Sequence, residues 1–294
     1  MTTLITGATG TIGSKVAQRL ITEGERVRVA SRDLRRLDGL VARGAEAVPL
    51  DLEDPASREA AFAGVERLFL VGPQASADFG DRVAEVVATA RDAGVKLIVR
   101  LSAVGAHPEA GFVLAREHGR AEQALAASGV PWVSLQPTFF QDNLLTYQRD
   151  AIRGQGAFYG ASSGGRVAYV SGDDIAEVAA RILREPASHV GRTYVLTGPE
   201  ALLDTEVAEL VSTVLDRPVR FVDVGLDAYR ANLAQAGSPE WMVESMAALE
   251  TIKAQGFASE ISPIVEQLLG RPATPFSRFL EAHAADFRGD SAAE

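Results

Sequence analysis

The sequence predicts an α/β protein, a Rossmann-type doubly wound parallel sheet with a smaller C-terminal α/β capping lobe. Short β-branched or leucine-rich segments alternate with amphipathic helical segments through the first half of the chain. Three glycines stand at the turn between the first strand and the first helix. After about residue 137 the alternation gives way to a mostly helical pattern. Together these observations indicate right-handed βαβ crossovers followed by a separate lobe.

The expected strands of the sheet are short apolar runs, as in parallel sheets that are buried on both faces. They are residues 3–6, 26–31, 45–50, 66–71, 96–101 and 131–136. Helices are expected between them. In the first helix Val16, Leu20 and Ile21 share one face, and Gly24 can end the helix.

The second half of the chain contains three further strand candidates, at residues 166–171, 192–197 and 219–224, which we expect in the smaller lobe. Residues 1–150 are expected to form the dinucleotide-binding Rossmann domain. Residues 151–294 are expected to form the smaller substrate-binding lobe. We expect the chain to cross between the lobes, which together would form one structural unit.

Composition and charge exclude several classes of function. The 294 residues include no cysteine, which excludes disulfides and thiolate chemistry. The four histidines are scattered, so no metal site is expected. A net charge of −10 argues against nucleic acid as a partner. No leader and no apolar run long enough to span a membrane is apparent, so we expect no membrane association and a cytoplasmic location. A homodimer is left open.

The segment "TGATGTIG" (6–13) predicts a dinucleotide site. Gly7, Gly10 and Gly13 let the backbone approach a pyrophosphate, which the amides at a helix N-terminus can hold. Thr9, Thr11 and Ile12 belong to the same expected site. The alternative is that the glycines only allow helix and strand to pack.

Two later strand ends extend the expected cofactor site. Arg32, in "ASRD" (30–33), can pair with a 2′-phosphate, which favours NADPH; Asp33 keeps NADH as an alternative. Asp51 and Leu52 are expected near the adenine ring, although Asp51 could instead cap a helix. Gly72 and Pro73 are expected along the cofactor backbone, or else in a simple turn.

The chain resembles the NmrA-like group of atypical short-chain dehydrogenases/reductases over nearly its whole length. This group includes type-2 NAD(P)H:quinone oxidoreductases, triphenylmethane reductase and a redox-sensing transcriptional regulator. The resemblance rests on the glycine turn and on several segments: "VASRD" (29–33), "LDLEDPAS" (50–57), "LSAVGA" (101–106), "HGRAEQALAASGVPWVSLQPTFFQDNL" (118–144) and "GRPATPFSRFLEAH" (270–283).

Active reductases of the wider superfamily carry a Tyr-x-x-x-Lys motif whose tyrosine donates a proton. Aligned on Glu122, this chain has Leu114 at the tyrosine position and His118 at the lysine position. The general acid is therefore absent, which puts ordinary ketone reduction and sugar epimerisation in doubt.

The resemblance implies two catalytic candidates. Ser102 matches a hydroxyl-bearing position and can contact the substrate or cofactor; the alternative is a helix or loop cap. His118 can contact the nicotinamide ribose or relay a proton, and a pKa near 6.5 suits that role. The alternative for His118 is an exposed pair with Glu122, one helical turn away.

The loop after the sixth strand flanks the nicotinamide in the family, which adds Pro137 to the cofactor site. Phe139 and Phe140 can stack on a flat substrate, and Asn143 can offer an amide. Trp241 and Met242 can line an apolar pocket. Core packing is the alternative for these aromatic and methionine side chains.

The function expected from these residues is NADPH-dependent hydride transfer to a small aromatic or quinone-like acceptor. Such acceptors delocalise the resulting oxyanion, so water can supply the proton that a tyrosine would otherwise give. Two alternatives remain: a reductase that tailors a secondary metabolite, and a non-catalytic NAD(P)-binding redox sensor.

Overall fold

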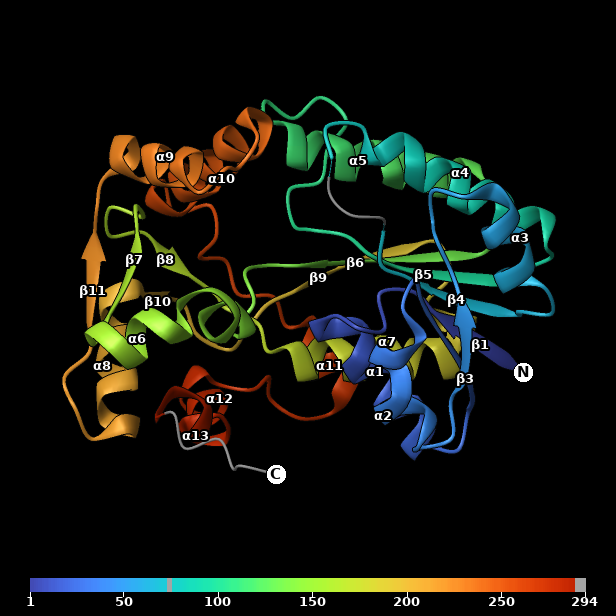
Figure 1. Ribbon diagram of the computed structural model, residues 1–294, viewed down its shortest axis with the longest axis horizontal. Coiled ribbons are helices and arrows are strands. Elements are labelled where there is room, and N and C mark those ends of the chain that lie inside the picture. The colour runs from blue at the N-terminus through green and yellow to red at the C-terminus, as the bar shows by residue number, and fades with distance from the viewer. Residues whose placement is uncertain (73–75, 289–294) are drawn as a thin grey trace. The chain divides into compact units, whose positions relative to one another are not determined.

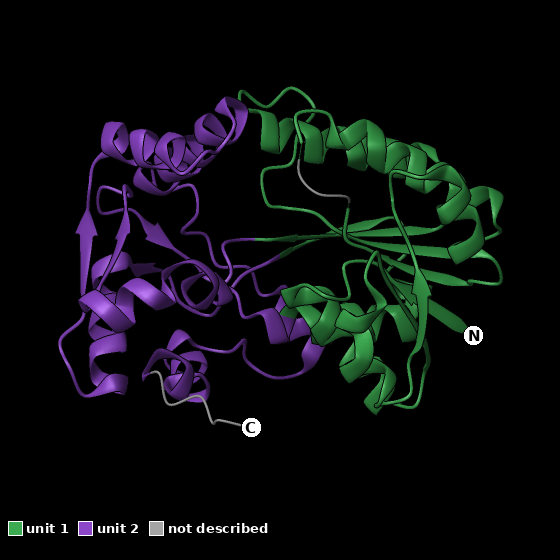
Figure 2. Cartoon of the chain, in the orientation of Figure 1, with its two compact units in different colours: residues 1–137, 175–195 green, residues 138–174, 196–294 purple. Residues whose placement is uncertain are grey.

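The computed structural model describes residues 1–72 and 76–288. The chain divides into two compact units, drawn in different colours in Figure 2. Unit 1 comprises Met1–Pro137 and Ile175–Val195, and unit 2 comprises Thr138–Asp174 and Leu196–Glu294. Each unit is therefore built from two separate stretches of the chain.

Unit 1 contains a seven-stranded sheet in the order β3-β2-β1-β4-β5-β6-β9. Its strands are β1 (Thr2–Ile5), β2 (Arg26–Ser31), β3 (Glu46–Pro49), β4 (Arg67–Leu70), β5 (Leu97–Leu101), β6 (Trp132–Pro137) and β9 (Arg192–Leu196). Strand β1 pairs in parallel with both β2 and β4, so the chain winds outward in two directions from the middle of the sheet. The doubly wound parallel sheet that the sequence predicts is confirmed.

Helices cover both faces of this sheet (Figure 1). One face carries α3 (Pro55–Phe62), α4 (Phe79–Asp92) and α5 (Val113–Ala127), and the other carries α1 (Thr11–Thr22), α2 (Asp38–Val41) and α7 (Gly172–Arg184). A short 3-10 turn, η1 (Leu34–Leu37), follows β2, and another, η3 (Pro186–Ser188), precedes β9. Helix α1 buries Val16 and Leu20 as expected, whereas Ile21 is only half-buried.

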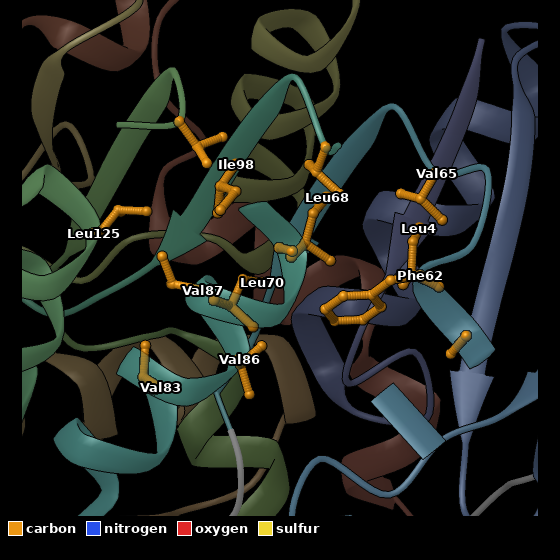
Figure 3. Close-up of a cluster of buried hydrophobic side chains, with 14 of the residues drawn as sticks. Leu4, Phe62, Val65, Leu68, Leu70, Val83, Val86, Val87, Ile98 and Leu125 are labelled. Carbon is orange, nitrogen blue, oxygen red and sulfur yellow. The ribbon is translucent and has the colours of Figure 1, made fainter. Parts of the chain in front are cut away.

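The core on the α3–α5 side joins strand residues to helix residues (Figure 3). Leu68 and Ile98 of the sheet belong to the same buried cluster as Val83 and Val86 of α4, and all four are fully buried. Burying such a side chain contributes about 1.5–3 kcal/mol. This packing holds α4 and α5 against the sheet, and α5 carries the histidine of the expected site.

Strand β9 differs from the expectation, because it lies in the main sheet beside β6 rather than among the strands of the smaller lobe. The backbone N–H of Gly191 donates to the carbonyl of Trp132, and that of Thr138 donates to the carbonyl of Leu196. The alternation of buried Tyr194 and Leu196 identifies a strand in the sequence. It does not identify the sheet that the strand joins.

Unit 2 contains two small pairs of strands and the remaining helices. Strand β7 (Ala157–Gly160) pairs in parallel with β11 (Arg220–Asp223), and β8 (Arg166–Val167) pairs antiparallel with β10 (Leu202–Leu203). The helices are α6 (Arg149–Gln155), α8 (Asp204–Leu215), α9 (Leu226–Gln235), α10 (Glu240–Ala254), α11 (Ile264–Leu269), α12 (Phe276–Ala282) and α13 (Ala284–Arg288), with a π-helical turn, η2 (Leu144–Gln148), before α6. The expected strand 166–171 shrinks to β8 and a single bridge between Phe140 and Val170.

Candidate functional site

The turn between β1 and α1 brings the backbone unusually close to itself. Gly7 has φ +62°, a left-handed conformation that favours glycine. A Cβ atom on Gly13 would lie 2.3 Å from the carbonyl oxygen of Gly7, so only glycine fits there. Gly10 is the N-cap of α1 and offers no side chain to the first helical amides. Those amides have no partner inside the helix, which leaves them available to an anion.

Thr6 fixes the end of β1 against the end of β4. Its hydroxyl donates to the carbonyl of Val71 at 2.8 Å and accepts the N–H of Val71 at 2.8 Å. The side chain is buried. This contact holds the glycine turn beside Gly72, where the cofactor backbone is expected.

A cavity of about 380 Å³ opens beside the glycine turn, at the ends of β1, β2 and β3. It is lined by Thr6, Gly7, Thr9, Ala30, Ser31, Arg32, Asp33, Arg36, Leu50, Asp51, Leu52, Glu53 and Gly72. A lining of glycine backbone, two arginines and a few apolar side chains suits a nucleotide, whose phosphates the arginines would bind.

The carboxylate of Asp33 is hydrogen-bonded within its own loop. Its carboxylate accepts two hydrogen bonds from the Arg35 guanidinium, both 3.0 Å, and one from the Arg35 backbone N–H at 3.2 Å. The side-chain hydrogen bond from Arg35 is the main reason why the pKa of Asp33 is lowered. The carboxylate is therefore ionised and held at the start of η1.

Arg32 and Arg36 differ from Arg35. Both are exposed, both line the cavity, and neither forms an ion pair within residues 1–72 and 76–288. A guanidinium that lacks a carboxylate partner can bind a phosphate through paired hydrogen bonds. Arg32 and Arg36 are thus two cations that can bind a 2′-phosphate. Arg35 is instead paired with the carboxylate of Asp33.

Asp51 is not the cap of α3, because Asp54 takes that position and accepts the N–H of Ala56 at 3.0 Å. Asp51 instead accepts the N–H of Glu53 at 3.0 Å and so shapes the turn that closes one side of the cavity. The buried Arg58 donates to the carbonyl of Leu52 at 2.6 Å and supports the same turn. These contacts hold Leu52 at the cavity wall.

A second group of polar side chains lies at the ends of β5 and β6, within unit 1. Ser102 directly follows β5 and is buried, and its hydroxyl has no hydrogen-bond partner in the described part of the chain. Its backbone N–H donates to the carbonyl of Leu135, and that of Val104 donates to the carbonyl of Pro137. Ser102 is therefore not a cap, and its unsatisfied hydroxyl remains available to a ligand oxygen.

His118 lies on α5 with its ring Nδ1 3.1 Å from Nη2 of Arg100. The rings of Phe79 and His118 pack edge to face, with their centroids 4.9 Å apart and their planes at 73°. Desolvation, followed by the charge of Arg100, lowers the pKa of His118 to about 3. The expected value near 6.5 is wrong, because the ring is desolvated and faces a cation. His118 is neutral in ordinary buffers.

Glu122 bonds to the sheet and not to His118. Its carboxylate accepts the hydroxyl of Ser134 at 2.6 Å and the amide of Gln136 at 3.0 Å, both from β6. The alternative of an exposed pair between His118 and Glu122 is therefore wrong. Glu122 ties α5 to the end of β6.

Two close contacts fix where α5 lies. The buried carboxylate of Glu117 accepts the N–H of Gly80 at 3.0 Å, which binds the start of α4 to α5. A Cβ on Gly119 would lie 2.2 Å from the carbonyl carbon of His107, so the preceding loop crosses α5 directly beside His118. Helix α5 is thus held from two sides.

The expected substrate residues lie in unit 2. Phe139 is half-buried, with the ammonium of Lys253 over its ring at 4.7 Å from the centroid and the ring of Tyr169 at 6.4 Å. Trp241 and Met242 lie in the first turn of α10, about 18 Å along the helix axis from Lys253. The structure therefore associates Phe139 with the end of α10, whereas Trp241 and Met242 lie near its start.

The cavity unites Gly7, Thr9, Arg32, Asp51, Leu52 and Gly72, whereas Gly10, Thr11, Ile12 and Gly13 form the adjoining helix start. Pro73 lies outside the described residues. Sequence reasoning missed the cavity residues Thr6, Ala30, Leu50 and Glu53 and did not identify Arg100. A charged residue inside the apolar run "KLIVRL" (96–101) was the available signal for Arg100.

Among residues 1–72 and 76–288, no cluster of three or more histidine or acidic side chains could hold a metal ion. No helix in the same residues is both long and apolar enough to cross a bilayer.

Comparison with known proteins identifies the family. An NAD(P)H-binding family model matches residues 7–186. An NAD(P)H azoreductase from Xenophilus azovorans is 36% identical over 97% of this chain and 98% of its own length. A (4-alkanoyl-5-oxo-2,5-dihydrofuran-3-yl)methyl phosphate reductase from Streptomyces griseus is also 36% identical, with the same coverage.

A solved structure gives the same picture. The NADPH-dependent quinone oxidoreductase QOR2 from Escherichia coli, complexed with NADPH, matches with a TM-score of 0.83 at 27% identity, over 96% of this chain and 99% of its own. The family resemblance, an NAD(P)H cofactor and the oxidoreductase class that the sequence predicts are confirmed. The chain belongs to the NAD(P)H-binding family and is an NAD(P)H-dependent oxidoreductase.

Proposed function

We propose that the protein transfers hydride from NADPH to a flat, electron-poor acceptor such as a quinone or another conjugated aromatic. One observation carries the proposal: the chain lacks an acid where reductases of ketones need one. Leu114 stands at the tyrosine position, and His118 is neutral and bonded to Arg100. An acceptor whose reduced form is a stabilised anion needs no such acid.

The chemistry balances without a protein acid. NADPH, when bound, supplies a hydride, which brings two electrons and one hydrogen to the acceptor. The acceptor becomes an anion spread over its conjugated system and then takes one proton from water. Ser102 and His118 hold oxygen atoms of the cofactor or acceptor by hydrogen bonds, and the protein contributes orientation and a dry pocket. The azoreductase and quinone oxidoreductase relatives support this acceptor class by their names.

The acceptor is expected to bind unit 2. Phe139 supplies an aromatic surface, Phe140 continues that segment, and Asn143 lies one turn further on. The Asn143 amide has no side-chain hydrogen bond in the part of the chain that is described, so it is free to bind an acceptor oxygen. We expect Trp241 and Met242 to line the acceptor site where the far end of a long acceptor would bind.

Turnover tests the proposal directly. Purified protein is mixed with NADPH and a panel of quinones and azo compounds, and the absorbance of the reduced nicotinamide is followed. We expect oxidation of NADPH that depends on both protein and acceptor. Tight NADPH binding without turnover on any acceptor would overturn the proposal and favour the redox-sensor alternative.

Truncating Phe139 to alanine should weaken acceptor binding selectively. Loss of aromatic stacking worth about 1–1.5 kcal/mol predicts a KM for the acceptor raised by roughly 10-fold. The dissociation constant for NADPH should stay unchanged, because Phe139 does not line the nucleotide cavity. Phe257→Ala is the matched control, since Phe257 is 73% exposed. Equal effects of the two variants would contradict this role for Phe139.

A second candidate acceptor is a small phosphorylated ring compound. The phosphate reductase from Streptomyces griseus is as similar as the azoreductase. Lys253, whose ammonium lies over Phe139 and 2.7 Å from Glu250, would supply the cation for a phosphate. Turnover of phosphorylated butenolides but of no quinone would select this candidate. The cytoplasmic location, the homodimer, and the absence of nucleic-acid and membrane partners stay predictions.

A further inference from the structure

Arg100 is a buried cation in the middle of an apolar strand. It is 1% exposed, and desolvation lowers the pKa of its guanidinium to about 10, so the group is still protonated at neutral pH. Its Nη2 lies 3.1 Å from Nδ1 of His118, while Nε and Nη1 have no partner in the described residues. Such a charge is costly to bury, so a position within the sheet needs a reason.

The contact with His118 defines which ring nitrogen carries the proton. A guanidinium has donors only, so Nδ1 must accept and cannot itself be protonated. In a neutral imidazole the proton then lies on Nε2, the nitrogen on the far side of the ring from Arg100. The edge contact with Phe79 restricts rotation of the ring. The ring therefore offers one N–H in one direction.

The surroundings keep this arrangement stable. The charged group that faces the ring from β5 is Arg100, α4 presents the apolar Phe79, and α5 itself presents Glu122 one turn further on. The Glu122 carboxylate is engaged by Ser134 and Gln136, and it stabilises the Arg100 cation through its charge. No carboxylate hydrogen-bonds to the His118 ring within residues 1–72 and 76–288, so nothing there favours an imidazolium.

We propose that Arg100 is a positioning residue that holds His118 as a neutral, Nε2-protonated hydrogen-bond donor. His118 then binds an oxygen of the cofactor ribose or the acceptor and gives up no proton during turnover. The part played by the His118 N–H rests on the proposed function. The tautomer itself does not, because it is a property of the protein without cofactor or acceptor.

Nitrogen NMR of the histidine rings tests the tautomer directly. The ¹⁵N-labelled chain has four histidines, and the His118 signals are assigned by their loss in His118→Gln. In the wild-type protein we expect an unprotonated Nδ1, a protonated Nε2 and no titration of the ring between pH 5 and 8. A protonated Nδ1, or a ring that titrates in that range, would overturn the proposal.

Two substitutions of Arg100 distinguish the effect of its N–H donors and charge from the effect of its packing. Arg100→Met keeps the bulk but removes both, so we expect mixed tautomers and a His118 pKa that rises from about 3 toward the ordinary 6.5, stopping short of it because desolvation remains. Arg100→Lys keeps a buried cation that can only donate, so it should restore the single tautomer. An Arg100→Met protein with unchanged His118 signals would overturn the proposal.

Controls keep the result interpretable. Amide spectra of each variant report whether the fold is kept. If Arg100→Met does not fold, the wild-type tautomer and the Arg100→Lys variant still decide the question. Absence of turnover with the expected tautomer would refute the proposed function alone. Turnover with the wrong tautomer would refute the role of Arg100 alone.

Discussion

Replacing Arg32 and Arg36 together by alanine is expected to raise the KM for NADPH by about 100-fold, while the KM for NADH changes little. Both guanidinium groups line the cavity and lack a carboxylate partner among the described residues. NADH has no 2′-phosphate and so loses nothing when they are removed. Steady-state kinetics with each cofactor at a fixed acceptor concentration measures the two constants.

Arg43→Ala is the matched control for this pair. Arg43 is exposed in the segment between α2 and β3 but does not line the cavity. It should leave both constants within about twofold, as expected of a surface charge outside the site. Equal losses with NADPH and NADH in the double variant would show that the arginines act on something other than the 2′-phosphate.

Gly13→Ala is expected to weaken NADPH binding by more than about 100-fold, because losing two backbone hydrogen bonds to the charged pyrophosphate, at about 1.5–3 kcal/mol each, costs at least that much. The new Cβ would lie 2.3 Å from the carbonyl oxygen of Gly7 and 2.6 Å from its carbonyl carbon, both backbone atoms that cannot swing aside. The turn must therefore move away from the start of α1, which removes the pyrophosphate position. Calorimetric titration with NADPH measures the loss, and thermal unfolding measures any loss of stability.

Gly39→Ala is the control for Gly13→Ala, because both glycines lie in helices. A Cβ on Gly39 meets no atom within 4 Å, so alanine should raise helix stability by up to about 1 kcal/mol and leave NADPH binding unchanged. Wild-type affinity in Gly13→Ala would contradict the idea that this glycine is needed for the dinucleotide site.

The dinucleotide half of the fold could be predicted from local sequence signals. Buried strands such as β5 appear as apolar runs, and the left-handed Gly24 (φ +80°) does end the first helix. The positions of the glycine turn and of Arg32 could also be predicted, because they follow the first and second strands of one βαβ unit. Strand β9 could not be assigned to the main sheet, because its alternation of residues says nothing about its neighbour. Strand β7 gave no clear signal in the sequence. The segment "AFYG" (157–160) has only four residues, of which Phe158 and Tyr159 alone are of a type that favours strands.

Side-chain partners were the other limit. The sequence indicated His118 and Glu122 as neighbours on α5, but their partners come from β5 and β6. Those partners are fixed only by tertiary packing. The pKa of His118 depends on burial of the ring and then on the charge of Arg100, so it could not be estimated from the histidine alone. Likewise, the pairing of Asp33 with Arg35 is local, yet its geometry depends on how η1 begins.

The discontinuity of the two units constrains any attempt to recombine this protein with its relatives. Unit 2 cannot be transplanted as a single cassette, because residues 175–195 return to unit 1 between its two stretches. A chimaera that exchanges unit 2 therefore needs three junctions, after Pro137, Asp174 and Val195. A single cut after Pro137 would strip α7 and β9 from the sheet and leave β6 as a bare edge, a template for aggregation.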